Sequence, residues 1–549
     1  MKYYIACLLI ILNFFAGFAS SLKPFRPKLL SPLNIPLVLS GNFGEIRSNH
    51  FHSGIDIKTQ HRIGLPVYAM ADGYVSRIRV TAGSGYMLDI AYGHGISSIY
   101  RHLDGFVDAI SALAREVQYR RQSWEVDFTL PPGKYPVKAG QQVAWSGNTG
   151  FSGGPHLHMD MYRTASKEYI DPLPFLKPYI QDHRKPQAVS LQIFPVEGQG
   201  EVNGTLRPHI FAFGNTINAW GKIGIAVKAF DHIDETWYCM GVRYVTLLQD
   251  GKKIFSSDIK CYSPTEAKMV YAWTYNGYMK SFIDPGNTLR FLKAYNGNEG
   301  YVTVNEERDY HFEYNLCDIF GNRSSYKFVV HGKRQPIPKA PIQTGVLLAW
   351  NKTNYVMRPG MALIVPFGML HENMYLNYKL IPSKSGVSYK YQLNYPPIPM
   401  SGTADLEIRL RKRPVADINK YYIAKWEGNV PMSTNNRTIQ KDAIVTKIKA
   451  LGTFSLMIDQ KPPHIMPVDQ HSWSRGKLVF SITDAQSGIK SYHGYIDGRF
   501  AIFDRTVKNT LVKCSIDSSR VQRGKMHTCT MVVEDICGNV ARYTKTFKW

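Results

Sequence analysis

Turn signals recur at short intervals along this chain, and the runs between them are too short for long helices. Asp72-Gly73 and Asp250-Gly251 are dipeptides typical of tight hairpin turns, and the first precedes a run of β-branched and aromatic residues. The 549 residues include 44 Gly, 31 Pro and 34 Tyr, which favours strands joined by turns. We therefore expect an all-β, mainly antiparallel protein made of several domains.

One segment departs from this pattern. Ile110, Leu113, Val117 and Tyr119 follow one another at nearly helical intervals. This spacing predicts a short helix, inserted between strands within residues 107–138.

Changes in composition divide the chain into four expected domains after the N-terminal segment. Proline-rich stretches, "DHRKPQ", "HGKRQPIPKAPIQ" and "DQKPPHIMPVD", mark the boundaries. The second and fourth domains end in similar text, "DIFGNRSSYKF" and "DICGNVARYTKTF", so we interpret both as copies of one immunoglobulin-like β-sandwich module. The expected units are a turn-rich domain at 24–185, a sandwich at 186–333, a β-rich domain of unknown role at 340–460 and a second sandwich at 461–549.

The first 21 residues have the layout of a secretory signal peptide. Lys2 precedes an apolar run, and the small residues Gly17, Ala19 and Ser20 follow it. No later apolar run is long enough to span a bilayer. We expect an exported protein of the periplasm or cell envelope, with the cell surface and an uncleaved N-terminal anchor as alternatives.

The formal net charge is +24. Export argues against a nucleic-acid partner, and the basic residues are scattered, with no block longer than "RKR" at Arg411, Lys412 and Arg413. Two interpretations stay open: attraction to an anionic envelope polymer or membrane surface, and a merely basic, soluble exterior.

Six cysteines lie beyond the signal segment, an even number that permits disulfides in an exported chain. Cys239 and Cys261 flank the Asp250-Gly251 turn, and Cys514 and Cys529 flank another expected hairpin. We expect each pair to close across neighbouring strands. The remaining pairing is undetermined, and no Cys-x-x-Cys motif is present.

Histidines and one aspartate in the first domain form candidate metal-binding fragments. His156 and His158 follow "SGGP" and, on a strand, would share a face, with Leu157 and Met159 turned to the core. By itself such a pair is equally well explained as surface histidines on a half-buried strand.

Two further fragments belong to the same domain. His52 and Asp56 have an even spacing that places them on one face of a strand, and Gly54 leaves room for a metal or a backbone to approach. His102 lies in "IYRHL" near the end of an apolar run. A catalytic zinc site commonly has three protein ligands and one open position. His52, Asp56 and His158 would supply two imidazoles and a carboxylate, which leaves His102 and His156 to act on a substrate.

The order HxxxD, YxHL and GGPHLH resembles the lysostaphin-type (LytM) zinc metallopeptidases, which cut peptide bonds in bacterial peptidoglycan. The resemblance covers residues 41–176 and extends to "GLPVYAMADGYV", "VKAGQQVAWSGNTG" and "IDPLPFL". It implies a β-sheet peptidase domain with a groove between loops, the zinc (Zn2+) ligands His52, Asp56 and His158, and the catalytic residues His102 and His156. Two features depart from the family pattern: Met159-Asp160, where Phe-Glu is frequent, and the insertion at 107–138.

These features predict an exported zinc metalloendopeptidase that hydrolyses peptidoglycan cross-links, with a D,D bond implied by the resemblance alone. One alternative is a non-catalytic LytM-like regulator of another wall hydrolase. The other is an adhesin or scaffold built from the sandwich domains, which would bind a protein partner. A self-inhibitory contact made by those domains is also open, as are the oligomeric state and the choice of general base between His102 and His156.

Overall fold

The computed structural model describes residues 28–383, 386–505, 508 and 510–549, so the expected signal peptide lies outside the described part. Strands account for 49% and helices for 8% of the residues. Apart from the parallel pairing of β15 with β24, the paired strands are antiparallel. The predicted all-β, mainly antiparallel fold class is confirmed. Within the described residues, no helix combines the length and apolar character needed to cross a membrane.

The first domain is built on one large antiparallel sheet with the order β1-β2-β11-β6-β5-β4-β8. A smaller sheet with the order β3-β10-β7 lies beside it. The strands of the two sheets are β1 (Leu39–Gly41), β2 (Gly54–Lys58), β11 (His156–Arg163), β6 (Ile96–Leu103), β5 (Gly85–Tyr92), β4 (Gly73–Thr81), β8 (Val126–Thr129), β3 (Pro66–Tyr68), β10 (Gln142–Trp145) and β7 (Gly105–Phe106).

Alternation along β2 and β11 separates a core face from a polar face. The two strands pair in register, with Ile57 opposite Leu157, Ile55 opposite Met159, and Asp56 opposite His158. The four apolar side chains are fully buried in the core of the domain. Because residues directly opposite in an antiparallel pair share a face, Asp56 and His158 lie together on the other side of the sheet.

The first domain contains one helix of several turns, α2 (Asp108–Arg121), within the segment for which a helix was expected. Ile110, Ala114 and Val117 are its buried apolar residues, which gives the helix one face toward the core. The helix ends at Gln122, which has a left-handed backbone conformation (φ 46°) and whose N–H bonds to the last turn.

The expected hairpins are formed only in part. Asp250-Gly251, with positive φ at both residues, joins β16 (Tyr244–Gln249) to β17 (Lys252–Asp258) as expected. Residues 93–95 form a further turn between the paired strands β5 and β6. The expectation of a hairpin at Asp72-Gly73 is wrong, because β3 pairs with β10 whereas β4 pairs with β5. That turn carries the chain from one sheet to the other.

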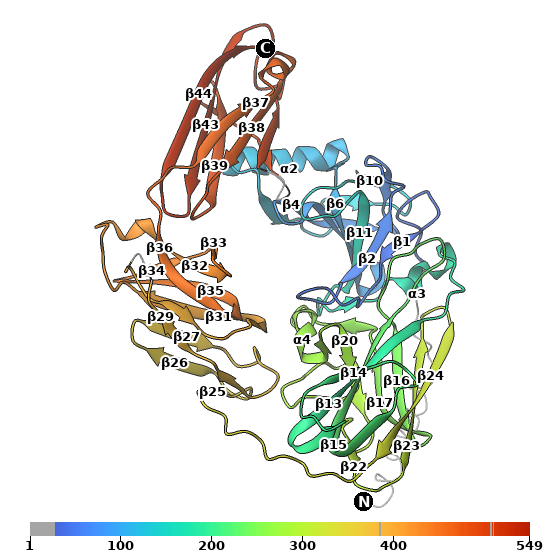
Figure 1. The fold of residues 1–549 in the computed structure, drawn as a ribbon. Helices are drawn as coiled ribbons and strands as arrows, with labels where there is room; N and C mark the ends of the chain where they lie inside the picture. Colours follow the sequence, from blue (N-terminus) through green and yellow to red (C-terminus); the bar gives the residue numbers. More distant parts are fainter. Residues whose placement is uncertain (1–27, 384–385, 506–507, 509) are drawn as a thin grey trace, which may run out of the picture.

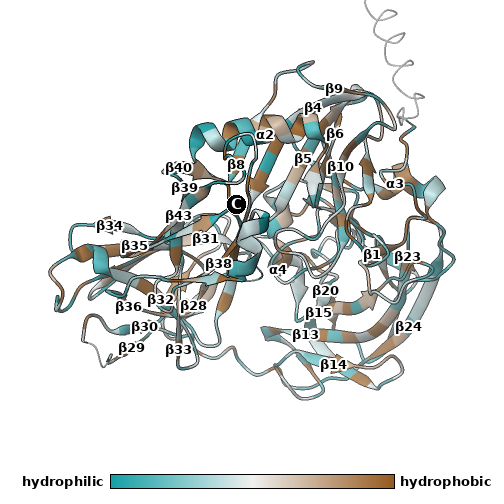
Figure 2. Ribbon diagram, turned by 90° about the horizontal axis from the view of Figure 1, so that it is seen from above, coloured by the Kyte–Doolittle hydropathy of each residue, from teal (hydrophilic) through white to brown (hydrophobic). Residues whose placement is uncertain are grey.

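The second domain contains a sheet with the order β14-β13-β15-β24-β23-β16-β17-β21. Figure 2 shows hydrophobic and hydrophilic residues interspersed along β15 and β24, as expected for strands with one face in a core. Its main elements are β13 (Gln187–Val202), β14 (His209–Phe211), β15 (Ile217–Phe230), β16 (Tyr244–Gln249), β17 (Lys252–Asp258), β18 (Cys261–Tyr262), α4 (Val270–Trp273), β20 (Tyr278–Lys280), β21 (Leu292–Ala294), β22 (Val302–Val304), β23 (Asp309–Cys317) and β24 (Arg323–Gly332).

The first two domains share an apolar boundary. Phe43 and Phe51 belong to the hydrophobic core of the second domain, and Phe43 stacks on Tyr262 with ring centroids 4.7 Å apart. β12 (Tyr169–Ile170) pairs both with β11 and with β18, which continues the sheet of the first domain into the second.

Two further β domains complete the chain, each with a pair of sheets around its own core. The third has the sheets β26-β27-β31-β35-β34 and β29-β30-β36-β32-β33, and the fourth has β37-β38-β42-β41 and β40-β39-β43-β44. The strands of the two sheets of the third are β26 (Asn354–Arg358), β27 (Met361–Val365), β29 (Lys379–Ile381), β30 (Lys390–Gln392), β31 (Ile398–Arg409), β32 (Tyr421–Glu427), β33 (Val430–Ser433), β34 (Thr438–Gln440), β35 (Ala443–Leu451) and β36 (Thr453–Ile458). The fourth contains β37 (His464–Val468), β38 (Lys477–Thr483), β39 (Ile489–Ile496), β40 (Arg499–Ala501), β41 (Asp504–Arg505), β42 (Leu511–Ser515), β43 (Met526–Asp535) and β44 (Val540–Lys548).

The expected disulfides are not present, because all six cysteines of the described chain are free thiols. Cys239 is exposed in a loop before β16, whereas Cys261 lies on β18 beside β12. Cys514 and Cys529 do not flank one hairpin, since β42 and β43 belong to different sheets of the fourth domain. The first two cysteines thus lie beyond the ends of the hairpin β16–β17, and the other two lie on strands of different sheets.

The chain curves so that the fourth domain lies against α2 of the first (Figure 1). The hydroxyl of Tyr119 donates to Asp517 Oδ2 at 3.2 Å, and the guanidinium of Arg520 lies 3.9 Å from the Tyr119 ring centroid. Lys508 Nζ donates to Asn148 Oδ1 at 2.7 Å, in the loop that precedes β11. The helix insertion is thus a docking surface for the C-terminal domain.

The Tyr119→Ala substitution is expected to loosen this docking without unfolding either domain, because the ring supplies both a hydrogen bond and a cation–π contact. Hydrogen exchange followed by mass spectrometry should show faster amide exchange in α2 and around Asp517. Tyr355→Ala, which removes an exposed tyrosine of the third domain, is the control. Equal exchange in the two variants would contradict the assignment of Tyr119 to this contact.

Candidate metal centre

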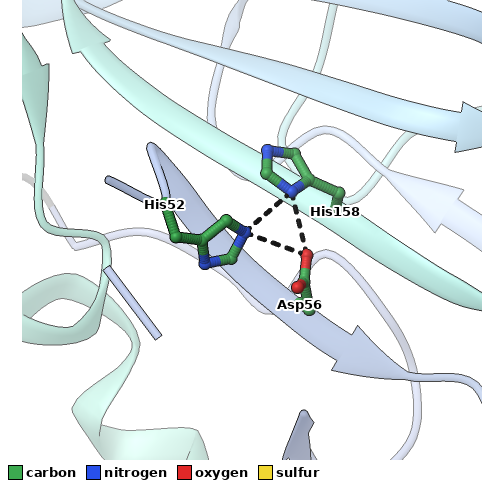
Figure 3. Close-up of side chains that lie close together, drawn as sticks. All are labelled: His52, Asp56 and His158. Carbon is green, nitrogen blue, oxygen red and sulfur yellow. Dashed lines mark hydrogen bonds and ion pairs between the residues drawn. The ribbon is translucent and has the colours of Figure 1, made fainter. Parts of the chain in front are cut away.

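Three side chains converge on the polar face of the large sheet (Figure 3). His52 Nε2 lies 3.1 Å from Asp56 Oδ1 and 3.1 Å from His158 Nδ1, and His158 Nδ1 lies 2.9 Å from Asp56 Oδ1. All three residues are buried. Asp56 comes from β2, His158 from β11, and His52 from the bend that enters β2. Two imidazole nitrogens and one carboxylate oxygen thus face a common point.

The backbones of β2 and β11 approach each other closely at Gly54, which brings the ligand side chains together. A Cβ atom on Gly54 would lie 2.2 Å from the carbonyl oxygen of Met159, so only glycine allows β2 and β11 to approach as they do. The room predicted at Gly54 is therefore taken by the neighbouring backbone.

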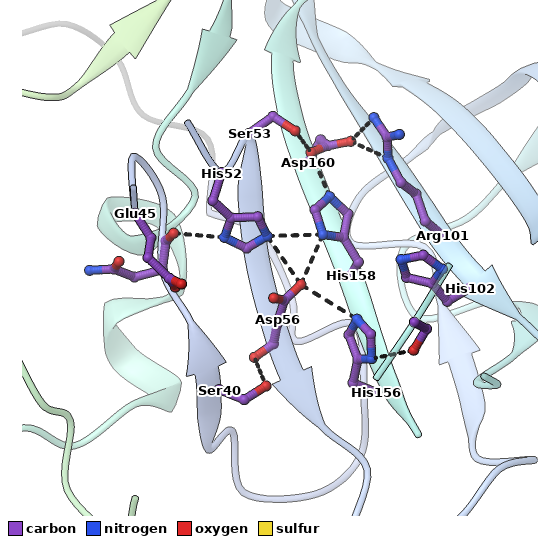
Figure 4. A network of polar contacts seen from close by, with 12 residues as sticks. Ser40, Glu45, His52, Ser53, Asp56, Arg101, His102, His156, His158 and Asp160 are labelled. Atoms are coloured by element: carbon purple, nitrogen blue, oxygen red, sulfur yellow. Dashed lines mark hydrogen bonds and ion pairs between the residues drawn. The ribbon is translucent and has the colours of Figure 1, made fainter. Parts of the chain in front are cut away.

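Hydrogen bonds on the far side of each ring orient the two imidazoles (Figure 4). His52 Nδ1 lies 2.7 Å from the carbonyl oxygen of Asn42, so its proton is on Nδ1 and Nε2 points into the group. His158 Nε2 lies 2.7 Å from Asp160 Oδ1, so Nδ1 points into the group. Asp56 is oriented by Arg47, whose Nη2 donates to Oδ2 at 2.8 Å. Such outer partners are typical of metal ligands.

Asp160 is the centre of a buried polar network behind His158. It is fully buried, and it accepts hydrogen bonds from Ser53 Oγ at 2.6 Å and Arg101 Nε at 2.7 Å. Burial acts to raise the pKa of Asp160, but the charges of Arg101 and His158 outweigh it and hold the pKa far below its ordinary value. For His158, burial acts to lower the pKa, yet Asp160 and Asp56 raise it to about 9.

His102 and His156 lie beside the convergent group rather than within it. Their ring centroids are 4.9 Å apart, and His156 Nε2 is 3.5 Å from Asp56 Oδ1. His102 Nδ1 lies 2.8 Å from the carbonyl oxygen of Thr149, and His156 Nδ1 lies 2.8 Å from that of Gly154. Each ring therefore carries its proton on Nδ1 and keeps a lone pair on Nε2.

Burial keeps both of these histidines neutral. It lowers the pKa of His102 to about 3, with further lowering by the neighbouring His158 and His156. The pKa of His156 is also lowered by burial, although Asp56 opposes the shift. His102 has a left-handed backbone conformation, with φ 59°, which is costly for a residue other than glycine and is typical of functional sites.

All five residues singled out in the sequence are therefore close together, with His52, Asp56 and His158 in contact and His102 and His156 adjacent. Two other histidines are elsewhere: His50 bonds to Asn49 at an exposed position, and His94 lies in the turn after β5 with φ 63°.

The sequence argument missed the supporting residues Asn42, Arg47, Arg101 and Asp160. Only Asp160 left a signal in the sequence, because it lies two residues after His158 and so shares its face of β11. The other three reach the centre from loops or adjacent strands.

Two family models match parts of the chain. Residues 50–113 match the model described as Peptidase family M23, and residues 345–459 match the Zu5-like domain. The second match falls on the third domain, for which the sequence suggested no role.

Curated relatives match a minor part of the chain. An uncharacterized metalloprotease of Haemophilus influenzae is 30% identical over 141 residues, which cover 26% of this chain and 22% of the relative. Lysostaphin of Staphylococcus simulans is 48% identical over 52 residues, 9% of this chain and 10% of lysostaphin. DD-carboxypeptidase/endopeptidase Mpg of Neisseria gonorrhoeae is 28% identical over 109 residues, 20% of this chain and 19% of Mpg. Each match thus spans under a third of the relative.

Solved structures match about a quarter of the chain. The catalytic domain of lysostaphin from Staphylococcus simulans is 28% identical, with 25% of this chain and 89% of that chain covered and a TM-score of 0.19. A zinc containing peptidase from Vibrio cholerae is 26% identical, with 26% and 37% covered and a TM-score of 0.19. The M23 model and the lysostaphin-type relatives agree with the resemblance found in the motifs. The first domain of this protein is a Peptidase family M23 domain.

Proposed function

We propose that this protein is a zinc metalloendopeptidase that hydrolyses peptide cross-links of bacterial peptidoglycan, D,D bonds among them, and that it acts after export in the periplasm or cell envelope. The observation that carries the proposal is the convergence of His52 Nε2, His158 Nδ1 and Asp56 Oδ1 within 3.1 Å of one another. The M23 match and the names of the relatives, which include endopeptidases and a metalloprotease, support the same activity.

The donor set fits zinc. Zinc is commonly bound by histidine nitrogen and carboxylate oxygen, and catalytic sites use three protein ligands. The outer hydrogen bonds of His52 and His158 turn Nε2 of His52 and Nδ1 of His158 toward each other and toward a carboxylate oxygen. Such a set of donor atoms is stabilised by a cation between them: a proton, as the pKa of His158 of about 9 indicates, or a metal ion that takes its place.

When bound, zinc supplies a Lewis acid that polarises a scissile carbonyl and lowers the pKa of water to about 7. His102 and His156 are placed to handle protons at that point, because each has a neutral ring with its lone pair on Nε2. One of them accepts the proton of the attacking water at Nε2, and the resulting imidazolium can return a proton to the leaving amine. The carbonyls of Thr149 and Gly154 hold the two rings in position throughout.

The His52→Ala and His102→Ala variants should separate metal binding from catalysis. His52→Ala should lose bound zinc, because it removes one of three ligands. His102→Ala should keep zinc and lose hydrolysis by a factor of about 10² to 10⁴, the usual contribution of a general acid or base. Zinc is measured by elemental analysis of the purified full chain, and hydrolysis by mass spectrometry of fragments released from purified peptidoglycan.

His50→Ala is the matched control, because His50 is an exposed imidazole two residues from His52 that is not one of the three convergent residues. It should retain both zinc and activity. Cleavage by His102→Ala at the parent rate would refute the catalytic role of His102. A parent chain that binds zinc but releases no fragments would instead support the non-catalytic regulator.

Asp160 is proposed as a positioning residue for His158. The Asp160→Asn substitution keeps the shape but removes the charge that orients the ring and pairs with Arg101. Zinc affinity should fall about 10- to 100-fold, the usual effect of losing an outer partner of a metal ligand. Competition with a chromophoric chelator measures this affinity, and Asp72→Asn, at an exposed aspartate of the same domain, is the control. Equal affinity in Asp160→Asn and the parent would exclude the positioning role.

A further inference from the structure

A second group of acidic side chains meets at the junction between the first and second domains. Asp182 comes from the segment that links the two domains, Asp231 directly follows β15, and Asp318 directly follows β23. One carboxylate oxygen from each lies within 4.8 Å of the others. The exposed fractions of the three residues are 7%, 4% and 3%, so three acidic groups from distant parts of the sequence are buried together.

No basic side chain of the described residues forms an ion pair with this group. The neighbouring cations are engaged elsewhere: Arg243 pairs with Asp171 and Asp258, and His183 pairs with Asp234. Three buried carboxylates without a counter-ion are strongly unfavourable in their charged form.

One oxygen of the group has no hydrogen-bond partner. Asp182 Oδ1 accepts the N–H of Arg184 at 3.0 Å, whereas Oδ2 is buried, has no donor outside the acidic group and lies beside the Asp318 carboxyl. Asp182, Asp231 and Asp318 line a partly enclosed space of about 10 Å³, close to the least volume that holds one water-sized particle. A buried acceptor without a donor, beside such a space, indicates a ligand that is not part of the chain.

Burial and the mutual repulsion of the three carboxylates raise the pKa of two of them. Burial, together with the nearby Asp318, raises the pKa of Asp182 to about 7. Burial and the charges of Asp318 and Asp182 raise the pKa of Asp231 to about 8. A bound divalent cation would reverse both effects, because it stabilises the charged form of each carboxylate.

We propose that Asp182, Asp231 and Asp318 bind a calcium ion at the junction of the M23 domain and the second domain. The site offers only oxygen donors, the ligands that hard cations such as calcium prefer, in contrast to the mixed nitrogen and oxygen donors of His52, Asp56 and His158. Calcium tolerates the irregular geometry of loop carboxylates better than magnesium, which requires a nearly regular octahedron.

The proposed ion would add a link between three segments: the interdomain linker, the end of β15 and the end of β23. Hydrogen bonds from Asn322 to the Asp182 carbonyl oxygen and from Arg184 to the Thr236 carbonyl oxygen already connect the linker to its neighbours. Asn42 lines the same partly enclosed space, and its carbonyl oxygen accepts the proton of His52 Nδ1. Asn42 therefore connects the proposed calcium site to His52 of the metal centre. The calcium site does not depend on the peptidase activity.

A similar group occurs at the junction of the third and fourth domains and differs in one respect. Asp459, Asp484 and Asp535 also approach within 4.8 Å, and Asp318 and Asp535 begin the repeated Asp-x-x-Gly-Asn text. There, however, the second oxygen of the linker aspartate is satisfied, because Ser487 donates to Asp459 Oδ2 through both N–H and Oγ. The proposal therefore concerns the first group alone.

Calcium binding is tested on the full chain by thermal unfolding after treatment with EGTA and addition of calcium chloride. Calcium should raise the midpoint of unfolding of the parent, and magnesium at the same concentration should raise it less. Equilibrium dialysis with ⁴⁵Ca should show one bound ion. The calcium effect should persist in His52→Ala, which separates this site from the zinc centre.

Asp231→Asn and Asp182→Asn should weaken calcium binding about tenfold or more, because each removes one of three charged ligands. In EGTA the same variants should be at least as stable as the parent, since they relieve repulsion between buried carboxylates. Asp234→Asn, at a nearby aspartate outside the group, is the matched control. The proposal is overturned if the parent binds no calcium, or if both variants bind calcium as tightly as Asp234→Asn.

Discussion

The register between β2 and β11 is the constraint on which the rest of the first domain depends. Because Asp56 faces His158 across the two strands, Ile57 must face Leu157 on the other side, so one pairing fixes both the hydrophobic core and the metal-binding face. A slip of one residue would expose four fully buried apolar side chains, each worth roughly 1.5–3 kcal/mol of burial, and would also turn the ligands into the core. The packing of the core thus also fixes the positions of Asp56 and His158, without further interactions being needed to set the register.

Much of the metal centre could be predicted because short-range periodicity determines it. The two-residue spacing of His156 and His158 requires only that they lie on a strand, and both lie on β11. The reasoning for His52 was less accurate, since this residue precedes β2 and reaches the group from a bend. The left-handed conformation of His102 could not be predicted, because no glycine or asparagine marks the position.

Contacts between segments far apart in the sequence could not be predicted from local sequence patterns. Arg101 meets Asp160 only because β6 lies next to β11, and the three aspartates of the proposed calcium site come from a linker and two strand ends. The disulfide prediction was wrong for the same reason. Symmetric spacing of two cysteines around a turn does not determine whether they lie on neighbouring strands of one sheet. The first aspartate of each repeated Asp-x-x-Gly-Asn segment belongs to an acidic group, but the sequence did not show which other aspartates complete each group.

The second domain is part of the support of the metal centre rather than a separate attachment. The Tyr262 hydroxyl donates to the His52 carbonyl oxygen at 2.6 Å, and the Asn42 side chain bonds to the backbone of Gly241 in both directions. Phe51, next to His52, is buried in the core of the second domain. The loop that orients His52 is therefore held from both sides, so removing the second domain would free the segment that carries a metal ligand. This dependence gives a physical reason for the two domains to be joined in one chain.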